Sequence, residues 1–133
     1  MKFLLDTDTV SYALRGQGGV GSKILSLKPS QLAVSSITVA ELRYGAERKA
    51  SQRLHALVSN FLSGVEVVDF DNDAAAIFGR IASLLAERGS PIGDFDVLIA
   101  AHAISLKRVL VTNNTKHFSR VPGLKIENWN DAK

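Results

Sequence analysis

The chain has 133 residues, of which 46% are hydrophobic and 22% are charged, proportions typical of one globular domain. It contains no cysteine, which excludes disulfides and thiolate metal sites, and no apolar run approaches the roughly 20 residues that cross a bilayer. The net charge of +3 is only mildly basic and selects no partner by itself. Because the sequence has no cysteine, no membrane-spanning run and no signal peptide, we expect one cytoplasmic domain over residues 1–133, without membrane contact.

The first half of the chain alternates short apolar runs, typical of buried strands, with patterns of helical period. The elements predicted there are, in order, a strand at 3–5, a helix at 9–15 capped by Thr7 or Asp8, a short helix at 20–27, a strand at 32–35, a helix that starts at Ser36 or Thr38 and contains ITVAELRYGAERK, and a helix at 51–63. Gly16 and Pro29 break the chain between them. The last two helices are expected to form a hairpin.

The second half continues the alternation and defines the fold class. Its predicted elements are a strand at 65–69, a helix from Asn72 or Asp73 to about Arg88, a helix at 95–107 with Asp94 as its N-cap, a strand at 109–111, a small helix near 115–119 and an edge strand at 124–127. The helix at 95–107 is apolar almost all round, so it should be buried. The pattern predicts an α/β fold with three layers, α/β/α, around a central parallel sheet of four to five short strands.

Acidic side chains are concentrated where the predicted strands end. Asp6 follows the first strand, Glu41 lies in the first turns of the helix after the second strand, and Asp96 lies in the first turn of the buried helix. Ligands bind at the carboxyl ends of parallel strands, so these three should lie at one edge of the sheet. Taken singly, each has a simpler interpretation. Asp6 suits a helix cap, Glu41 suits an exposed helical position, and Asp96 suits the positive end of its helix.

Convergence of the three acids favours a metal site. Two carboxylates about 4 Å apart repel by roughly 4 kcal/mol at an effective dielectric near 20, so three together need protons or a cation. Mg²⁺ prefers hard oxygen ligands, and Mn²⁺ accepts the same donor set. A metal held by Asp6, Glu41 and Asp96 could activate water and stabilise charge on a phosphoryl group.

Four motifs together resemble the PIN-domain family, in particular the VapC-type toxins of bacterial toxin–antitoxin pairs. They are FLLDTD at 3–8, SSITVAELRYGAE at 35–47, PIGDFDVLIAAHAISL at 91–106 and LVTNNTKHFSRVPGLKIENW at 110–129. Their order and spacing match over almost the whole chain. The resemblance implies a PIN-like fold and a single PIN domain over residues 1–133.

The resemblance also assigns roles to individual residues. It implies that Asp6, Glu41 and Asp96 are the acidic metal ligands and catalytic residues. The fourth acidic position of the family falls on Asn114, an amide that adds no charge, so we expect one tightly held Mg²⁺. Three further residues are expected to support the site: Thr112 by hydrogen bonding, Asp94 as N-cap and outer acid, and Asp8 as a helix cap that touches metal-bound water.

The same resemblance implies an activity and partners. The expected activity is Mg²⁺-dependent endoribonuclease cleavage, with transfer RNA as the first choice of substrate and the anticodon loop of initiator tRNA as a specific candidate. A cognate VapB-type antitoxin, a homodimer and a higher toxin–antitoxin assembly are the expected partners. Arg43, Lys116 and Arg120 are the basic side chains expected to contact RNA.

Three other hypotheses compete with this one. The opening LLDTDTV also suits a haloacid dehalogenase-like phosphohydrolase, in which Asp6 would be a covalent nucleophile, but GDFD precedes LVTNN, the reverse of that family's order. A phosphoacceptor receiver domain would need an acidic pair and a strand-end lysine that the sequence lacks. A PIN domain that only binds RNA or an antitoxin stays open, because Asn114 is not acidic.

Overall fold

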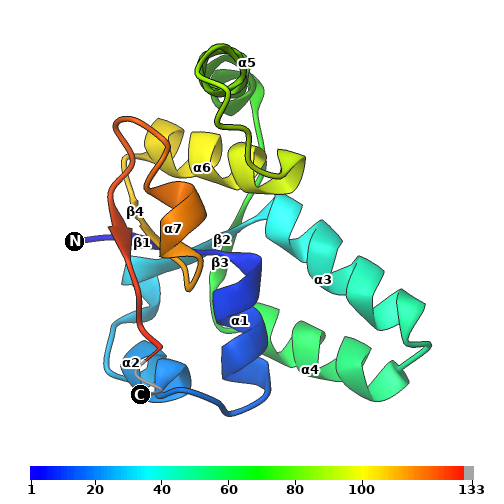
Figure 1. Ribbon diagram of the computed structural model, residues 1–133. Helices are drawn as coiled ribbons and strands as arrows, with labels where there is room; N and C mark the ends of the chain where they lie inside the picture. The colour runs from blue at the N-terminus through cyan, green and yellow to red at the C-terminus, as the bar shows by residue number, and fades with distance from the viewer. Residues whose placement is uncertain (131–133) are drawn as a thin grey trace.

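The protein folds around a five-stranded parallel sheet, as seen in a computed structural model that describes residues 1–130 (Figure 1). The strands are β1 (Phe3–Leu5), β2 (Leu32–Ser35), β3 (Glu66–Val68), β4 (Val109–Val111) and β5 (Ile126–Glu127). The helices are α1 (Thr7–Leu14), α2 (Val20–Leu25), the 3₁₀ turn η1 (Pro29–Gln31), α3 (Ser36–Arg48), α4 (Gln52–Leu62), α5 (Asn72–Glu87), α6 (Asp94–Leu106) and α7 (Thr115–Phe118). The predicted α/β fold and its order of elements are confirmed.

The order of strands places a crevice beside β1. The sheet runs β3-β2-β1-β4-β5, and every neighbouring pair is parallel. From β1 the chain goes to β2 on one side, and β4 later adds on the other side. Ligands bind in parallel sheets at such a switch in strand order, outside the carboxyl ends of the strands.

Alternate side chains along the strands pack into two separate hydrophobic cores, one on each face of the sheet. Phe3 and Leu5 of β1 face a cluster that includes residues of α1, α2, α3 and α4, whereas Leu4 faces a cluster built largely from α5, α6 and α7. This alternation follows from the two-residue period of a strand. Figure 1 shows α5 and α6 on one side of the sheet and α1, α2 and α4 on the other, so the predicted three layers are present.

Two predicted helix caps are wrong. Asp6, and not Thr7 or Asp8, caps α1, because its side chain accepts a hydrogen bond from the backbone N–H of Thr9 at 2.8 Å. Gly93 precedes α6 and provides no side-chain cap, so Asp94 lies inside the first turn of that helix. In both cases the helix begins one or two residues earlier than the sequence pattern predicted. No helix within residues 1–130 is long and apolar enough to cross a membrane.

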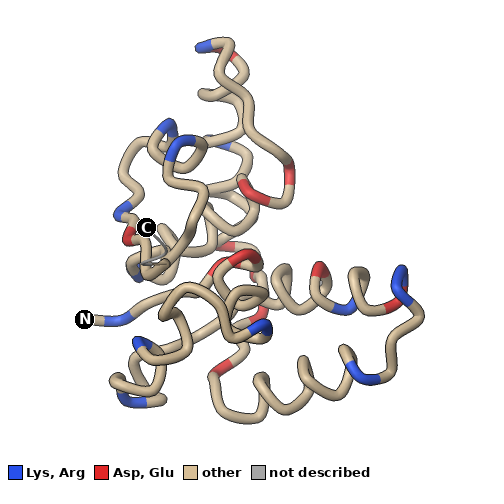
Figure 2. The backbone as a smooth tube through the Cα atoms, turned by 60° about the horizontal axis from the view of Figure 1, so that its bottom comes forward, with Lys and Arg blue, Asp and Glu red and all other residues tan. Residues whose placement is uncertain are grey.

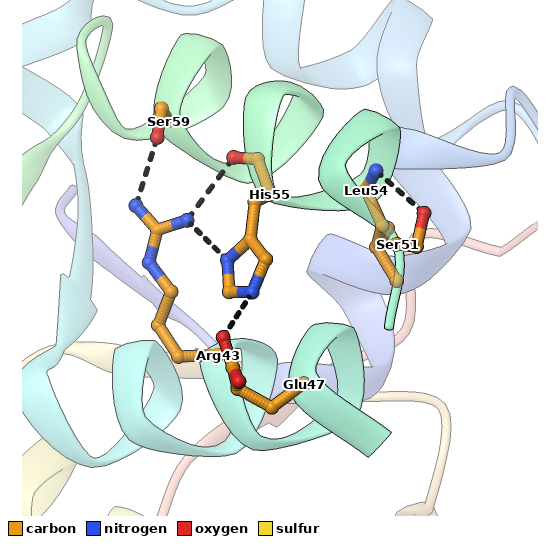
Figure 3. A network of polar contacts seen from close by, with 6 residues as sticks. All are labelled: Arg43, Glu47, Ser51, Leu54, His55 and Ser59. Atoms are coloured by element: carbon orange, nitrogen blue, oxygen red, sulfur yellow. Dashed lines mark hydrogen bonds and ion pairs between the residues drawn. The ribbon is translucent and has the colours of Figure 1, made fainter. Parts of the chain in front are cut away.

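The predicted hairpin of α3 and α4 is held together by a polar network (Figure 3). The Arg43 guanidinium donates to Ser59 Oγ at 2.9 Å and to the backbone carbonyl of His55 at 3.0 Å, and it lies 3.1 Å from His55 Nδ1. A guanidinium only donates, so Nδ1 accepts and His55 Nε2–H donates to Glu47 Oε2 at 2.7 Å. Arg43 is therefore engaged with α4, and its predicted RNA contact stays a prediction.

Substitution of Arg43 by Ala is expected to destabilise the protein by about 1–2 kcal/mol, because several hydrogen bonds between the two helices are lost. Urea unfolding followed by circular dichroism measures the change. Arg48→Ala is the matched control, since Arg48 is exposed on the same helix and should change stability by less than about 0.5 kcal/mol. Equal effects of the two substitutions would show that the network contributes nothing.

Candidate active site

Asp6 is fixed at the carboxyl end of β1 by both its backbone and its side chain. Its N–H donates to the carbonyl of Val111 in β4 at 3.0 Å, and its carboxylate caps α1 through Thr9. The hydroxyl of Thr9 donates to the same Val111 carbonyl at 3.0 Å. The side chain of Thr112, fully buried at the end of β4, also hydrogen-bonds to Asp6. This hydrogen bond to Asp6 agrees with the supporting role predicted for Thr112.

Burial makes the Asp6 carboxylate unusually basic. Desolvation raises the pKa of Asp6 from 3.8 to about 6, against the opposing effect of hydrogen bonds from Thr112 and Thr9. The negative charge of Asp8 raises it further. Asp6 is only 4% exposed, so the fold keeps an ionisable group where its charged form is poorly solvated. Buried carboxylates of this kind are typical of catalytic and metal sites.

Glu41 reaches toward α1 from the second turn of α3. Thr7 Oγ donates to Glu41 Oε1 at 2.6 Å and lies 3.3 Å from Thr38 Oγ. Desolvation raises the pKa of Glu41, the Thr7 hydrogen bond lowers it, and the charges of Asp96 and Asp8 raise it again. Thr7 is a contributor that the sequence did not single out. It lies between the two acids of the DTD motif, but nothing in the sequence paired it with Glu41.

Asp96 belongs to the same electrostatic group. It is half-buried in the first turn of α6, and desolvation and the charge of Asp8 raise its pKa, whereas His117 on α7 lowers it. Helix α6 is buried through Ile99, Ala100 and their neighbours, so its first turn is held rigidly at the edge of the sheet. Asp96 thus acts electrostatically on Glu41, and Asp8 acts on Asp6, Glu41 and Asp96 alike.

Asp8 has a different part from the one predicted. It is exposed, it does not cap α1, and its charge raises the pKa of Asp6, Glu41 and Asp96 alike. The sequence suggested a cap that touches metal-bound water. The negative charge of Asp8 makes the other three acids hold protons, or a cation, more tightly.

The end of β4 contributes uncharged polar groups. The N–H of Asn114 donates to Thr112 Oγ at 2.9 Å, and Asn114 Nδ2 lies 2.9 Å from His117 Nδ1. His117 thus touches Asn114 and acts electrostatically on Asp96. The sequence analysis missed it, although its position three residues after Asn114 matches one turn of a helix. Asp94 is exposed on the first turn of α6.

Basic side chains surround this acidic region. Figure 2 shows several acidic segments close together near the middle of the view, with basic segments on the surrounding parts of the chain. Lys116 and Arg120 are exposed on and just after α7. Arg120 also donates to the backbone carbonyl of Pro91 at 3.3 Å, which ties it to the segment before α6. Their predicted RNA contacts remain predictions.

The donor set fits a hard divalent cation, although its present side-chain conformations do not enclose one. Within residues 1–130, no three carboxylate or imidazole groups stand close enough together to hold one ion. The three acids nevertheless share one edge, each has a raised pKa, and Glu41 and Asp96 repel each other. All their donors are carboxylate oxygens, as Mg²⁺ and Mn²⁺ prefer. Glu41 and Asp96 would have to close around an ion together with Asp6.

Comparison with known proteins agrees with this fold. Residues 3–124 match the PIN domain family. The chain is 42% identical to the tRNA(fMet)-specific endonuclease VapC of Salmonella typhimurium, over 97% of this chain and 98% of that protein. It is 40% identical to ribonuclease VapC2 of Haemophilus influenzae, with the same coverage. The likeness therefore extends over nearly the full length of both relatives.

Two crystal structures are similar over the same span. DNA-bound VapBC from Salmonella typhimurium gives a TM-score of 0.91 at 42% identity, covering 97% of this chain and 98% of that chain. VapBC2 from Rickettsia felis, bound to a DNA fragment from its promoter, gives 0.90 at 35% identity, covering 97% and 99%. The sheet and the helices that flank it are thus those of a PIN domain. The chain belongs to the PIN-domain family and, within it, to the VapC proteins.

Proposed function

We propose that this protein is the ribonuclease toxin of a VapBC-type toxin–antitoxin pair and that it cleaves RNA with the help of Mg²⁺. The observation that carries the proposal is the group of Asp6, Glu41 and Asp96 at the carboxyl edge of the sheet, each with a raised pKa. Ribonucleases related over nearly the full length support the same activity. We propose one PIN domain over residues 1–133, acting in the cytoplasm.

Three acids divide the work of holding the ion. Asp6, Glu41 and Asp96 would bind Mg²⁺, with Mn²⁺ as a substitute, and the bound ion would supply activation of water and stabilisation of charge on the phosphodiester. Thr112 and the N–H of Thr9 orient Asp6. Thr7 orients Glu41. The hydrogen bonds to Asp6 fix that acid before substrate arrives, which reduces the reorganisation needed for reaction, whereas Glu41 and Asp96 would still move toward the ion.

The neutral Asn114 supports a single ion rather than two. An amide can orient water or substrate, but it adds no charge to offset a second divalent cation. Its contact with His117 keeps the amide oxygen free to accept a hydrogen bond, since Nδ2 is the atom that faces the ring. Lys116 and Arg120, exposed nearby, suit phosphates on either side of the cut.

Transfer RNA is the substrate we propose first. The relatives from Salmonella typhimurium and Shigella flexneri are both named tRNA(fMet)-specific endonucleases, at 42% and 38% identity. We therefore propose initiator tRNA, cut in its anticodon loop, as the specific target. Unpaired loop bases are accessible to a cleft in a way that paired bases are not.

A VapB-type antitoxin is the proposed partner. The similar structures from Salmonella typhimurium and Rickettsia felis are VapBC complexes, which supports a partner of the same kind for this chain. We propose a homodimer that assembles further with the antitoxin. Expression of this chain alone should slow growth, and co-expression of the adjacent antitoxin frame should restore it. Normal growth of cells that contain abundant folded protein would contradict a toxin.

Incubation with labelled initiator tRNA should give cleavage in Mg²⁺ or Mn²⁺ and none in EDTA, because the acids alone cannot offset phosphoryl charge. Gel electrophoresis measures the products, with elongator tRNA and messenger RNA beside the first substrate. Asp96→Asn is the inactive control. Cleavage that persists in EDTA would overturn the mechanism, and cleavage of messenger RNA alone would overturn the proposed target.

A second candidate function is RNA or antitoxin binding without cleavage. Two observations favour it: Asn114 replaces an acid, and the three carboxylates are not yet closed around an ion site within the described residues. Binding of tRNA without any cleavage in Mg²⁺ or Mn²⁺ would select this function over the first. The phosphohydrolase and receiver hypotheses are wrong, because the chain belongs to the PIN-domain family.

A further inference from the structure

A cavity lined by basic residues lies at the edge of the sheet opposite to the candidate active site. It has a volume of about 400 Å³, within the range of small-ligand sites, and it is formed where β1, β4 and β5 begin. Lys2 and Lys125 line it on the two sides of β4, and Lys107 lines it from the end of α6. The candidate active site, by contrast, lies where the same strands end. The two sites are therefore separated by the length of the sheet, at least about 10 Å for strands of this length.

Hydrogen bonds of the sheet fix where the lysine backbones lie. The carbonyl of Lys2 accepts from Val109 N–H at 3.0 Å, and the carbonyl of Lys125 accepts from Leu110 N–H at 2.9 Å. Lys2 and Lys125 thus flank the first two residues of β4. Lysines 2, 107 and 125 come from distant parts of the sequence, and the fold alone brings them to one cavity.

The three lysines have no acidic partners. Within residues 1–130 none of the three lysines forms an ion pair, and no acidic residue lines the cavity. Arg108 also lines it, but its guanidinium donates to the Phe3 carbonyl and to Glu66, both at 3.2 Å. Arg108 is therefore neutralised, whereas the lysines present three uncompensated positive charges. Such a group attracts phosphates.

Lys107 occupies an unfavourable backbone conformation. Its φ of 56° and ψ of 41° are left-handed, at the end of α6, where glycine or asparagine is normally found. A cation there stabilises the negative end of the helix, which is one benefit of a lysine. That benefit does not require lysines at the starts of β1 and β5. The convergence of all three on one cavity is what indicates a ligand.

We propose that this cavity binds a nucleotide of the RNA substrate that lies away from the cleaved bond. Lys2, Lys107 and Lys125 hold its phosphate, and the apolar side chains of Ile104 and Leu124, which line the same cavity, cover the face of its base. The inference rests on RNA as the substrate of the proposed function. It implies a preference for folded RNA, because only a substrate that spans both edges of the sheet reaches both sites.

The test removes the three positive charges and varies the length of the RNA. In the triple variant Lys2→Ala, Lys107→Gly and Lys125→Ala, KM for full-length tRNA should rise about tenfold or more while kcat stays unchanged. The dependence of log affinity on log salt should become shallower by about 2–3 units. Cleavage of a short oligonucleotide that covers only the active site should not change. A salt dependence equal to that of the unmodified protein would overturn the proposal.

A matched control separates this cavity from general charge. Lys28, Arg80 and Arg88 are exposed elsewhere, and their replacement by Ala removes the same number of positive charges. This control variant should bind tRNA nearly as the unmodified protein does. Equal weakening by both variants would show that only net charge matters. Lys107→Gly alone removes left-handed strain, so its melting temperature should not fall, and any lost affinity cannot come from unfolding.

Further measurements keep the proposal independent of cleavage. Fluorescence anisotropy of labelled tRNA in the Asp96→Asn background reports binding even if no RNA is cut, so failure of the nuclease function is distinguished from failure of this site. Calorimetry with adenosine monophosphate tests the cavity alone. Nucleotide binding that the triple variant abolishes, with tRNA binding unchanged, would assign the cavity to free nucleotides and overturn the RNA proposal.

Discussion

Asp6→Asn is expected to remove RNA cleavage, by more than about 100-fold, while the protein stays folded. Asparagine is as good an N-cap as aspartate, so the bond from the Thr9 N–H is retained and α1 keeps its start. What is lost is the negative ligand at the carboxyl end of β1, and loss of even an outer partner of a metal ligand costs 10–100-fold. Initial rates of tRNA cleavage at saturating Mg²⁺ measure the effect.

Asp8→Asn is the matched comparison, two residues further along the chain in the first turn of α1. Asp8 is exposed and makes no cap, so its replacement should leave most of the activity. Its charge raises the pKa of Asp6, Glu41 and Asp96, so its removal should lower all three pKa values. The acid limb of the rate profile should then move to lower pH. Complete inactivity of Asp8→Asn would instead support a mechanism in which Asp6 is a covalent nucleophile and Asp8 is its acid–base partner.

Asp6→Asn is also expected to stabilise the metal-free protein at neutral pH, by up to about 3 kcal/mol. The folded pKa of Asp6 is about 6 and its ordinary value is 3.8, so the native chain holds this proton more tightly than the unfolded chain does. The stability contributed by the protonated form is fully present below about pH 4 and is lost as pH rises through 6. Above that, the native state carries a poorly solvated charge.

Thermal or urea unfolding in EDTA between pH 4 and pH 8 measures this effect. The unmodified chain should lose stability relative to Asp6→Asn across that window, and the difference should shrink when Mg²⁺ is added, since the ion compensates the buried charge. Asp73→Asn is a suitable control, because Asp73 is exposed on α5 and is not among the charges that shift the pKa of Asp6, Glu41 or Asp96. A difference independent of pH would show that burial of Asp6 is not the cause.

The fold was largely predictable because the central strands β1 and β4 are short and wholly apolar, and β2 is apolar up to Ser35. β2 and β4 begin and end where the sequence predicts, since their runs of buried residues are bounded by polar ones. β5 is shorter than predicted, at Ile126–Glu127, because an edge strand pairs on one side only and its pattern is weak. The starts of α1 and α6 were less predictable. The N-cap is the residue whose side chain accepts a hydrogen bond from the first backbone N–H groups of the helix, and the sequence alone did not show which residue this is.

The sequence was enough to single out the three acids of the candidate site, but it was not enough to predict the contacts that shift their pKa values. Asp6, Glu41 and Asp96 follow strand ends or open helices, which the sequence displays directly. The bond from Thr7 to Glu41 joins residues 34 positions apart, and only the packing of α1 against α3 creates it. The hydrogen bonds of Arg43 to α4 were not predicted for the same reason. Its charge is visible in the sequence, whereas its engagement with α4 depends on the angle of the hairpin.

The position of β1 in the sheet has a consequence for synthesis of the protein. β1 is the first strand to leave the ribosome, yet it is central, and Asp6 is fixed through Val111 of β4, near the other end of the chain. Glu41 and Asp96 are likewise far from Asp6 in sequence. A nascent chain shorter than about 111 residues therefore has no assembled site. We expect that the polypeptide cannot attack RNA until its translation is nearly finished, which protects the machinery that makes it.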